Sequence, residues 1–165
     1  MKRILIVGSS GSGKTTLARE LSKKLKLPIV YLDHLYWLPG RVHRPTEEFY
    51  ALMMQACQQN GWIMDGNSIR SLAGRIPFAD KIIFIDVPRR TCMWRVIKRA
   101  IGGLFSGSEF APGCRNGINW EFFSWVWHWE ARYCPMLVRI LARAPQEKVV
   151  ILQGAKAIAD FLATL

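Results

Sequence analysis

The sequence predicts an α/β fold in which five parallel strands form one sheet with helices on both faces. Short apolar runs rich in β-branched residues alternate along the chain with segments whose apolar residues recur at helical spacing. Such alternation is typical of crossover connections, which cover both faces of a parallel sheet. The chain has 165 residues, of which 50% are hydrophobic and 21% charged. This size and composition predict one domain over residues 1–165 with a core of its own.

Five apolar runs are the predicted strands, and most end at a residue suited to a turn or a ligand. They are RILIV before Gly8, PIVYLD ending at Asp33, WIMD ending at Asp65, KIIFIDV before Pro88, and KVVIL at 148–152. The carboxyl ends of parallel strands lie at one edge of the sheet, where ligands of such folds bind. We therefore expect four residues to converge there, namely Gly8, Asp33, Asp65 and Asp86.

The segments between the strands predict helices and two irregular stretches. Helices are expected over 14–26, over 46–60 with Thr46 as N-cap, as a short helix or turn within 68–77, over 89–101, over about 119–143 with a break near Pro135, and over 155–165. Residues 34–45 are expected to form a loop. The stretch 102–118 is rich in Gly, Ser and Pro, which predicts a mobile excursion that forms a small lid.

A phosphate-binding loop is the strongest motif in the chain. Residues 8–16 read GSSGSGKTT, which matches the Walker A pattern Gly-x-x-x-x-Gly-Lys-Thr between a strand and a helix. Small residues let backbone N–H groups surround phosphate oxygens, and the helix N-terminus adds its positive dipole. The motif therefore predicts the three-layer P-loop NTPase fold with ATP and Mg²⁺ as cofactors. The predicted nucleotide ligands are Gly8, Ser9, Ser10, Gly11, Ser12, Gly13, Lys14, Thr15 and Thr16.

Particular roles follow for the residues in and around this loop. Lys14 is expected to reach the β- and γ-phosphates and to act in catalysis, and Thr15 to ligate the metal. Phosphoryl transfer also needs a carboxylate near the metal and a group that positions the acceptor. We assign Asp65 to the outer shell of the metal and Asp33 to catalysis and acceptor binding. An alternative role for Asp33 is to cap a turn or a helix. An alternative role for Asp86 is to orient a loop.

The basic segment after the fourth strand resembles the adenylate kinase-like P-loop kinases. DVPRRTCMWRVIKR is similar to their Val-Pro followed by an Arg seven residues on and another four later. The resemblance implies that Arg95 lies against the nucleotide base and that Arg99 contacts phosphates as a catalytic residue. WIMDGNSIR is similar to the strand that ends in Asp-Gly before a substrate-binding Arg. This similarity implies that Arg70, which is one position out of register, binds the substrate. Arg75 is the alternative.

The whole chain resembles a small subgroup often labelled DNA topology modulation proteins, or adenylate kinase-related proteins. YLDHLYWLPG, WIMDGN and INWEFFSWVWHW carry this similarity. The chain departs from the family in its lid, because residues 102–118 contain a single arginine, Arg115. Arg41 is a candidate for binding an anionic acceptor, as is Arg44, and solvated loop charges are the alternative for both.

The net charge and the aromatic residues indicate which binding partners the protein could have. The net charge of +11 at pH 7 suits nucleic acid, an anionic membrane face or a polyphosphate ligand. Seven aromatic residues lie between Trp120 and Tyr133, which predicts a packed helix with spare aromatics in a homodimer contact through 119–143. The alternative is that these aromatic side chains stack on the bases of single-stranded nucleic acid.

The expected location is the cytoplasm, without a membrane partner. No apolar stretch reaches the eighteen or so residues of a membrane span. Four widely spaced cysteines without a Cys-x-x-Cys pair are expected to be reduced thiols. No His/Cys spacing resembles a zinc site.

Two functions fit these features. The first is a small-molecule kinase of the nucleoside or nucleotide type, which transfers the ATP γ-phosphate to an acceptor that the sequence does not identify. The second is a nucleic-acid-associated ATP-binding protein with little or no kinase activity, although no helix-turn-helix, zinc finger or RNA-recognition signature is present. A GTP switch is disfavoured because the Asn/Thr-Lys-x-Asp motif that recognises guanine is missing.

Overall fold

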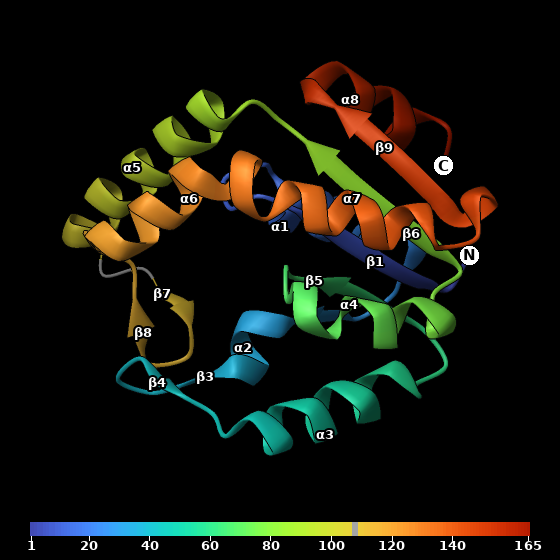
Figure 1. Ribbon diagram of the computed structural model, residues 1–165, viewed down its shortest axis with the longest axis horizontal. Coiled ribbons are helices and arrows are strands. Elements are labelled where there is room, and N and C mark those ends of the chain that lie inside the picture. Colours follow the sequence, from blue (N-terminus) through green and yellow to red (C-terminus); the bar gives the residue numbers. More distant parts are fainter. Residues whose placement is uncertain (107–108) are drawn as a thin grey trace.

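The computed structural model describes residues 1–106 and 109–165, and its centre is a five-stranded parallel sheet. The strand order is β2-β5-β1-β6-β9. Figure 1 shows β5, β1, β6 and β9 in this order. These strands are Ile29–Tyr31 (β2), Trp62–Asp65 (β5), Arg3–Gly8 (β1), Lys81–Asp86 (β6) and Val149–Gln153 (β9). The predicted fold class is confirmed.

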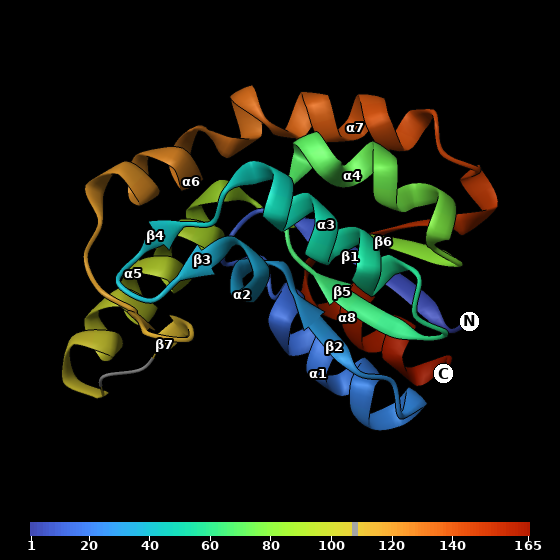
Figure 2. The same ribbon diagram turned by 90° about the horizontal axis from the view of Figure 1, so that it is seen from below.

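Helices cover both faces of the sheet, as Figures 1 and 2 show. One face carries α1 and α8, and the other carries α3, α4 and α7. The bounds of these helices are Lys14–Leu25 (α1), Thr46–Cys57 (α3), Ile69–Arg75 (α4), Cys134–Ala142 (α7) and Gly154–Ala163 (α8). Two 3₁₀ turns complete the layers, at Ile76–Phe78 (η1) and Gln146–Lys148 (η2).

The two-residue period of the central strands explains the two cores. In β1, Leu5 and Val7 enter the core under α3, α4 and α7, whereas Ile4 and Ile6 enter the core under α1 and α8. β6 lies beside β1 in register and alternates in the same way. A strand buried on both faces is a continuous apolar run. This is why RILIV and KIIFID were recognisable as central strands.

The segment after β2 differs from the prediction. β2 ends at Tyr31, and Asp33 lies in the first turn of a short helix, α2 (Leu32–Tyr36), rather than at a strand end. The predicted loop is in part a β-hairpin of β3 (Trp37–Leu38) and β4 (Val42–His43), turned by Gly40 and Arg41 with positive φ. Thr46 is the first residue of α3 and not its cap.

The predicted excursion at 102–118 is more regular than expected. Helix α5 spans Arg89–Ser106 and continues through both glycines. A two-stranded hairpin follows, formed by β7 (Glu109–Ala111) and β8 (Cys114–Arg115). A Cβ at Gly103 would lie 2.5 Å from the Asn116 Cβ, so this glycine lets the returning chain pass against the helix. Residues 107–108 of the predicted excursion lie outside the described part.

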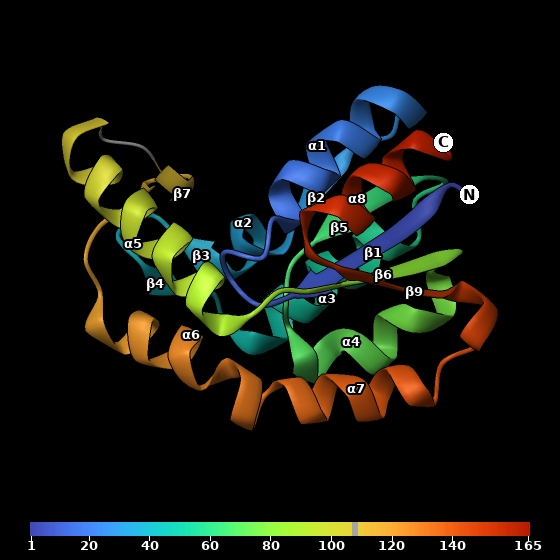
Figure 3. The same ribbon diagram turned by 90° about the horizontal axis from the view of Figure 1, so that it is seen from above.

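The predicted break in the long helix is confirmed. Helix α6 spans Trp120–Arg132, Tyr133 separates it from α7, and Pro135 lies in the first turn of α7. The Asn119 side chain caps α6 by accepting a 2.8 Å hydrogen bond from the Phe122 backbone N–H. The two helices cover different neighbours: α7 packs against the sheet layer, whereas α6 packs against α5 beyond the sheet (Figure 3).

Candidate active site

The phosphate loop connects β1 to α1 and is wedged between two other elements. A Cβ at Gly8 would lie 2.4 Å from the Ile85 carbonyl oxygen at the end of β6. A Cβ at Gly11 would lie 2.4 Å from the Cys92 carbonyl oxygen in the first turns of α5. Gly8 and Gly11 also have φ values of 144° and 81°. The loop therefore needs glycine at both positions for its conformation and for its close packing.

The end of the phosphate loop that leads into α1 has features that suit an anion. Gly13, at the N-cap of α1, has a φ of 106°, and no side chain caps the helix. The first N–H groups of α1 therefore face the loop with the positive end of the helix dipole. The Ser12 hydroxyl is buried and has no hydrogen-bond partner within the described residues. Both features fit a bound phosphate.

Lys14 lies within the loop that it is predicted to serve. Its Nζ donates a 2.8 Å hydrogen bond to the Ser9 carbonyl oxygen. Burial lowers the pKa of Lys14, and the carboxylates of Asp65 and Asp33 oppose this shift. The ammonium group is thus partly desolvated, which strengthens its attraction to a phosphate oxygen.

Thr15 and Asp65 fit the requirements of a magnesium ion. The Thr15 hydroxyl donates a 2.5 Å hydrogen bond to Asp65 Oδ2, so the two oxygens meet beside the loop. Mg²⁺ prefers hard oxygen ligands and usually keeps several waters. A hydroxyl with a carboxylate behind it matches an inner-shell ligand and an outer-shell partner. In the part of the chain that the structure describes, no cluster of three or more His, Cys, Asp and Glu side chains forms an all-protein metal site.

Asp33 reaches the same region from α2. Its carboxyl group is accessible to solvent but lies among crowded protein atoms, and this desolvation raises its pKa. Lys14 and Arg99 act in the opposite direction, and Asp65 adds to the increase. These effects place Asp33, Lys14 and Arg99 within electrostatic reach of one another. The prediction that Asp33 comes to this edge of the sheet is confirmed, although a helix and not a strand end positions it.

Two arginines of α5 face the phosphate loop, one helical turn apart. Arg95 donates hydrogen bonds to the carbonyl oxygens of Gly11 at 3.2 Å and Ser12 at 3.4 Å. Its guanidinium group therefore holds the loop from outside, and stacking on a base stays a prediction. Arg99 lies further along the helix, where burial lowers its pKa and Asp33 counteracts that shift.

Asn67 is a site residue that the sequence did not single out. Its Oδ1 accepts a 3.0 Å hydrogen bond from the Gly8 backbone N–H, and its Nδ2 is buried without a partner among the described residues. The side chain therefore fixes the start of the phosphate loop from the segment that follows β5. The only sequence signal was its position directly after Asp65-Gly66, at the carboxyl end of a buried strand.

The other candidate arginines differ in their exposure to solvent and in their hydrogen-bond partners. Arg75, the last residue of α4, is fully buried. Its Nη2 donates to the Ser68 carbonyl oxygen, and burial lowers its pKa to about 10. Arg75 is therefore not available to an acceptor. Arg44 donates to the Leu35 carbonyl oxygen and pairs with Glu48, which makes it a structural residue. Arg70 is exposed on α4, and its proposed contact with an acceptor stays a prediction.

Arg41 joins the two small hairpins. Its Nη2 donates a 2.6 Å hydrogen bond to the Arg115 carbonyl oxygen, and its guanidinium carbon lies 5.6 Å from the centre of the Phe110 ring. The Gly40 backbone N–H donates to the Gly113 carbonyl oxygen at 3.1 Å. We call the paired hairpins β3–β4 and β7–β8 the hairpin clasp. Arg41 thus has a structural role in this clasp, and its role in binding an acceptor stays a prediction.

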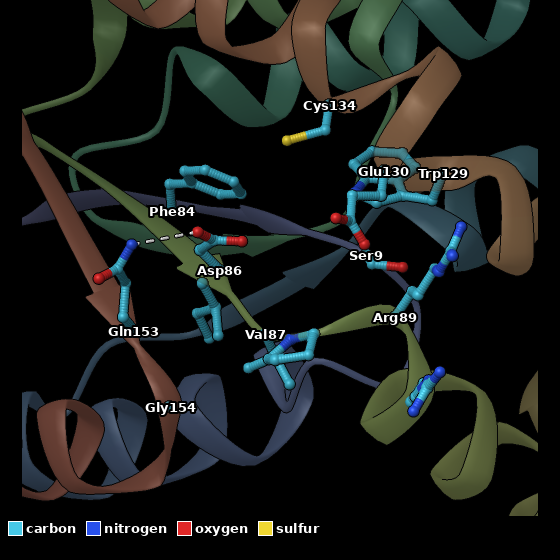
Figure 4. Close-up of a pocket in the computed structure, with 13 residues that line it drawn as sticks. Ser9, Phe84, Asp86, Val87, Arg89, Trp129, Glu130, Cys134, Gln153 and Gly154 are labelled. Atoms are coloured by element: carbon cyan, nitrogen blue, oxygen red, sulfur yellow. Dashed lines mark hydrogen bonds between the residues drawn. The ribbon is translucent and has the colours of Figure 1, made fainter.

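Asp86 connects two strand ends, and its loop-orienting role stays a prediction. Its Oδ2 accepts a 3.3 Å hydrogen bond from Gln153, which ties the end of β6 to the end of β9. Asp86 also lines a cavity of about 780 Å³, which Figure 4 shows. Ser9, Trp129, Glu130 and Cys134 face the same cavity.

This geometry defines a class of protein. A parallel sheet with a glycine-rich loop between its central strand and a helix, a Lys inside that loop and a Thr–Asp pair beside it characterise a P-loop nucleotide-binding protein. A family model described as "ATPase family associated with various cellular activities (AAA)" matches residues 4–87, just over half of the chain. The chain belongs to this family.

One curated protein is similar to a short part of the chain. A shikimate kinase of Parabacteroides distasonis is 41% identical over 51 residues, which are 31% of this chain and 28% of that protein. The matched segment therefore spans less than a third of the relative's length.

Two solved structures share the fold over nearly the whole chain. A shikimate kinase from Acinetobacter baumannii in complex with shikimate has a TM-score of 0.65 and 14% identity, covering 99% of this chain and 90% of that one. A gluconokinase from Sinorhizobium meliloti has a TM-score of 0.53 and 14% identity, covering 98% and 87%. At this identity the likeness establishes the fold.

Proposed function

We propose that this protein is an ATP-dependent phosphotransferase that acts on the hydroxyl group of a small molecule. The observation that carries the proposal is that Asp33 of α2 lies within electrostatic reach of Lys14 and Arg99, and both cations oppose the rise of its pKa. A nucleotide-binding switch needs the loop and its metal ligands. A carboxylate from a separate element, held between two cations, is the additional part that transfer to an acceptor needs.

Each residue then has a defined task. The phosphate loop and the N-terminus of α1 bind the phosphates, and Lys14 and Arg99 stabilise the charge that develops on the transferred phosphoryl group. Asp33 orients the acceptor hydroxyl and accepts its proton. The acceptor oxygen forms a bond to the γ-phosphorus as the bond between that phosphorus and the ADP oxygen breaks. Thr15, with Asp65 behind it, would hold a magnesium ion, which would supply neutralisation of phosphate charge.

The acceptor is a small hydroxylated compound. The similar proteins are two shikimate kinases, one of them solved in complex with shikimate, and a gluconokinase. Both names indicate hydroxylated organic acids, whereas the sequence resemblance favours a nucleoside or a nucleoside monophosphate. The basic side chains near Asp33 suit an anionic acceptor of either kind.

An acceptor panel tests this proposal. Purified protein is incubated with ATP and Mg²⁺ in the presence of shikimate, gluconate, nucleosides, nucleoside monophosphates or no acceptor, and ADP is measured. We expect one class to accelerate ADP release and to gain the phosphoryl group, with Asp33→Ala abolishing the acceleration. ADP release that no acceptor changes, at a rate equal in Asp33→Ala, would contradict kinase activity.

The interpretation as a nucleic-acid-associated protein, suggested by the DNA topology modulation subgroup, stays a prediction, as do the homodimer through α6 and α7 and the cytoplasmic location. The aromatic side chains of α6 are only partly available for stacking on nucleic acid. Trp120 is exposed, Phe123 packs edge-on against it, and Trp127 is covered by the Arg89 guanidinium at 4.6 Å. The features of the phosphate loop that suit a phosphoryl donor therefore support the proposal better than these aromatic side chains support the alternative.

A further inference from the structure

Helix α5 has a second apolar face, on the flank that points away from its neighbour. Its members are strongly exposed, from 39% for Ile97 to 87% for Phe105. We call this set the outer stripe; it comprises Trp94, Ile97, Ile101, Leu104 and Phe105. Successive members are three, four, three and one residues apart, so they follow one side of the helix. Figure 3 shows α5 projecting from the sheet with α6 along one side.

The outer stripe is separate from the face that packs inside the protein. Cys92, Val96 and Ala100 form the buried face of α5, and Cys92 and Val96 pack with Val126 of α6. An amphipathic surface helix normally has a single apolar face with polar residues opposite. A contiguous apolar patch of this kind on a protein surface marks an interaction site.

The charges around the stripe determine what can cover it. Helix α5 contains five basic residues and no acidic residue. Arg90 precedes Trp94 by four residues on the same side, and Lys98 Nζ lies 5.1 Å from the centre of the Trp94 ring. The whole chain carries a net charge of +11. The occupant must therefore present apolar contact and negative charge together.

A second copy of the chain does not meet this requirement. Pairing α5 with itself would bring Arg90 and Lys98 of both copies together, with no acidic side chain on the helix to compensate. The stripe also spans only about two heptads, whereas a coiled-coil seam needs at least three or four. A stable dimer interface includes roughly 20–30 residues a side, far more than this stripe provides.

We propose that the outer stripe of α5 docks on the surface of an anionic lipid bilayer, with the helix lying in the plane of the interface. Helices that bind in this way combine Trp, Phe and Leu on one face with Lys and Arg beside it. Aromatic side chains suit the boundary between headgroups and acyl chains, and basic side chains are attracted to anionic headgroups.

Docking is peripheral and leaves the candidate active site accessible. Among the described residues, no helix is long and apolar enough to cross a membrane. Arg95 and Arg99 lie on a different flank of α5, towards the phosphate loop, so docking of the stripe does not use them. The sequence led us to expect no membrane partner, and the exposed stripe revises that expectation. The inference does not depend on kinase activity.

Vesicle sedimentation tests the inference. The protein is mixed with vesicles of phosphatidylcholine alone, or with phosphatidylserine as about a third of the lipid. We expect binding to the anionic vesicles only, weakened by salt. The double variant Leu104→Ser with Phe105→Ser should reduce this binding by about tenfold or more, because it removes two large inserted side chains. Both residues are exposed, so an unchanged thermal unfolding curve is expected for the folded variant.

A matched variant controls for general surface hydrophobicity. Met136 and Val138 of α7 are exposed by 48% and 49%, and their replacement by Ser should leave vesicle binding unchanged. No binding to anionic vesicles, or an equal loss in this control, would overturn the inference. A concentration-dependent dimer that Leu104→Ser with Phe105→Ser abolishes would assign the stripe to a second copy instead. Loss of single-stranded DNA binding in that variant, without vesicle binding, would assign it to nucleic acid.

Discussion

The donor half and the acceptor half of the candidate site are built by different means. The donor half is a backbone structure: nine consecutive residues, from the last residue of β1 into the first turn of α1, form the phosphate loop, wedged against the ends of β6 and α5. The acceptor half that we propose would be a side-chain structure assembled from α2, α5 and the hairpin clasp. The contact of Arg41 with Arg115 joins residues that are 74 positions apart.

This difference predicts how each half responds to change. A backbone cradle depends on glycine and on local packing, so substitutions there act on nucleotide binding and on folding together. A side-chain assembly separates those effects, because one group can be removed while the scaffold stays intact. The following four experiments test this contrast, from the largest expected effect to the smallest.

Replacing Asp33 with Asn should lower turnover by roughly 100-fold or more while nucleotide affinity stays unchanged, because a proton acceptor is lost from the acceptor side alone. In the native protein, turnover should fall on acidification at a pH above 3.8, since desolvation raises the Asp33 pKa from that value. Pre-steady-state and steady-state kinetics between acidic and neutral pH measure both effects.

The stability of the same variant provides an internal control. A carboxyl group with a raised pKa in the folded state contributes stability that is present below its unfolded pKa and is lost as the pH rises through the folded value. Asp33→Asn removes this ionisation, so the free energy of unfolding at neutral pH should be unchanged or higher. Loss of turnover together with clear destabilisation would contradict a purely catalytic role.

Replacing Gly11 with Ala should weaken nucleotide binding by about tenfold or more and lower the free energy of unfolding by about 1–3 kcal/mol. The added methyl group meets the Cys92 carbonyl oxygen, and the φ of 81° disfavours any side chain. Calorimetric titration and denaturant unfolding measure the two effects. Gly74→Ala is the matched control: its Cβ meets nothing within 4 Å, and in a helix it should stabilise by about 0.5–1 kcal/mol.

Replacing Asn67 with Ala should lower nucleotide affinity by about fivefold, which corresponds to about 1 kcal/mol for one lost hydrogen bond. The Gly8 N–H loses its partner, and the loop loses its support from the segment after β5. Titration with ADP measures the effect. Asn60→Ala, at an exposed position after α3, should have no effect. Equal affinities for the Asn67 and Asn60 variants would show that this hydrogen bond does not preorganise the loop.

Replacing Arg41 with Ala should lower kcat/KM for the acceptor by about threefold and leave nucleotide affinity unaltered, because one exposed hydrogen bond of the clasp is lost. Competition kinetics with the acceptor found in the panel measure this effect. Arg19→Ala, which removes an exposed arginine of α1, controls for the change in net charge. An effect on nucleotide affinity alone would place Arg41 on the donor side.

The same contrast explains which features the sequence predicted. The phosphate loop and the central strands are local: the motif is contiguous, and strands buried on both faces are uninterrupted apolar runs. The break before α7 was also local, because it depends on Pro135. Gly8, Lys14, Thr15 and Asp65 are therefore found together as expected.

The acceptor side depends on contacts between distant segments, which a single sequence does not display. Asp33 is positioned by α2, a five-residue helix whose pattern is too short to distinguish from the end of a strand. Gly102 and Gly103 looked like the end of α5, but Gly103 serves the close approach of Asn116 instead. Asn67 was missed because its partner, the Gly8 N–H, lies 59 residues away.

The contact of Gly11 with the Cys92 carbonyl oxygen gives α5 a mechanical property. The phosphate loop and the first turns of the helix touch backbone against backbone, so they move as one body. With 18 residues, α5 is a rigid lever about 27 Å long. A tilt of about 5° around the loop moves the far end by roughly 2 Å, so a small rotation at the loop becomes a larger displacement at the far end. Hydrogen exchange in the last turn of α5 should therefore change when nucleotide fills the loop.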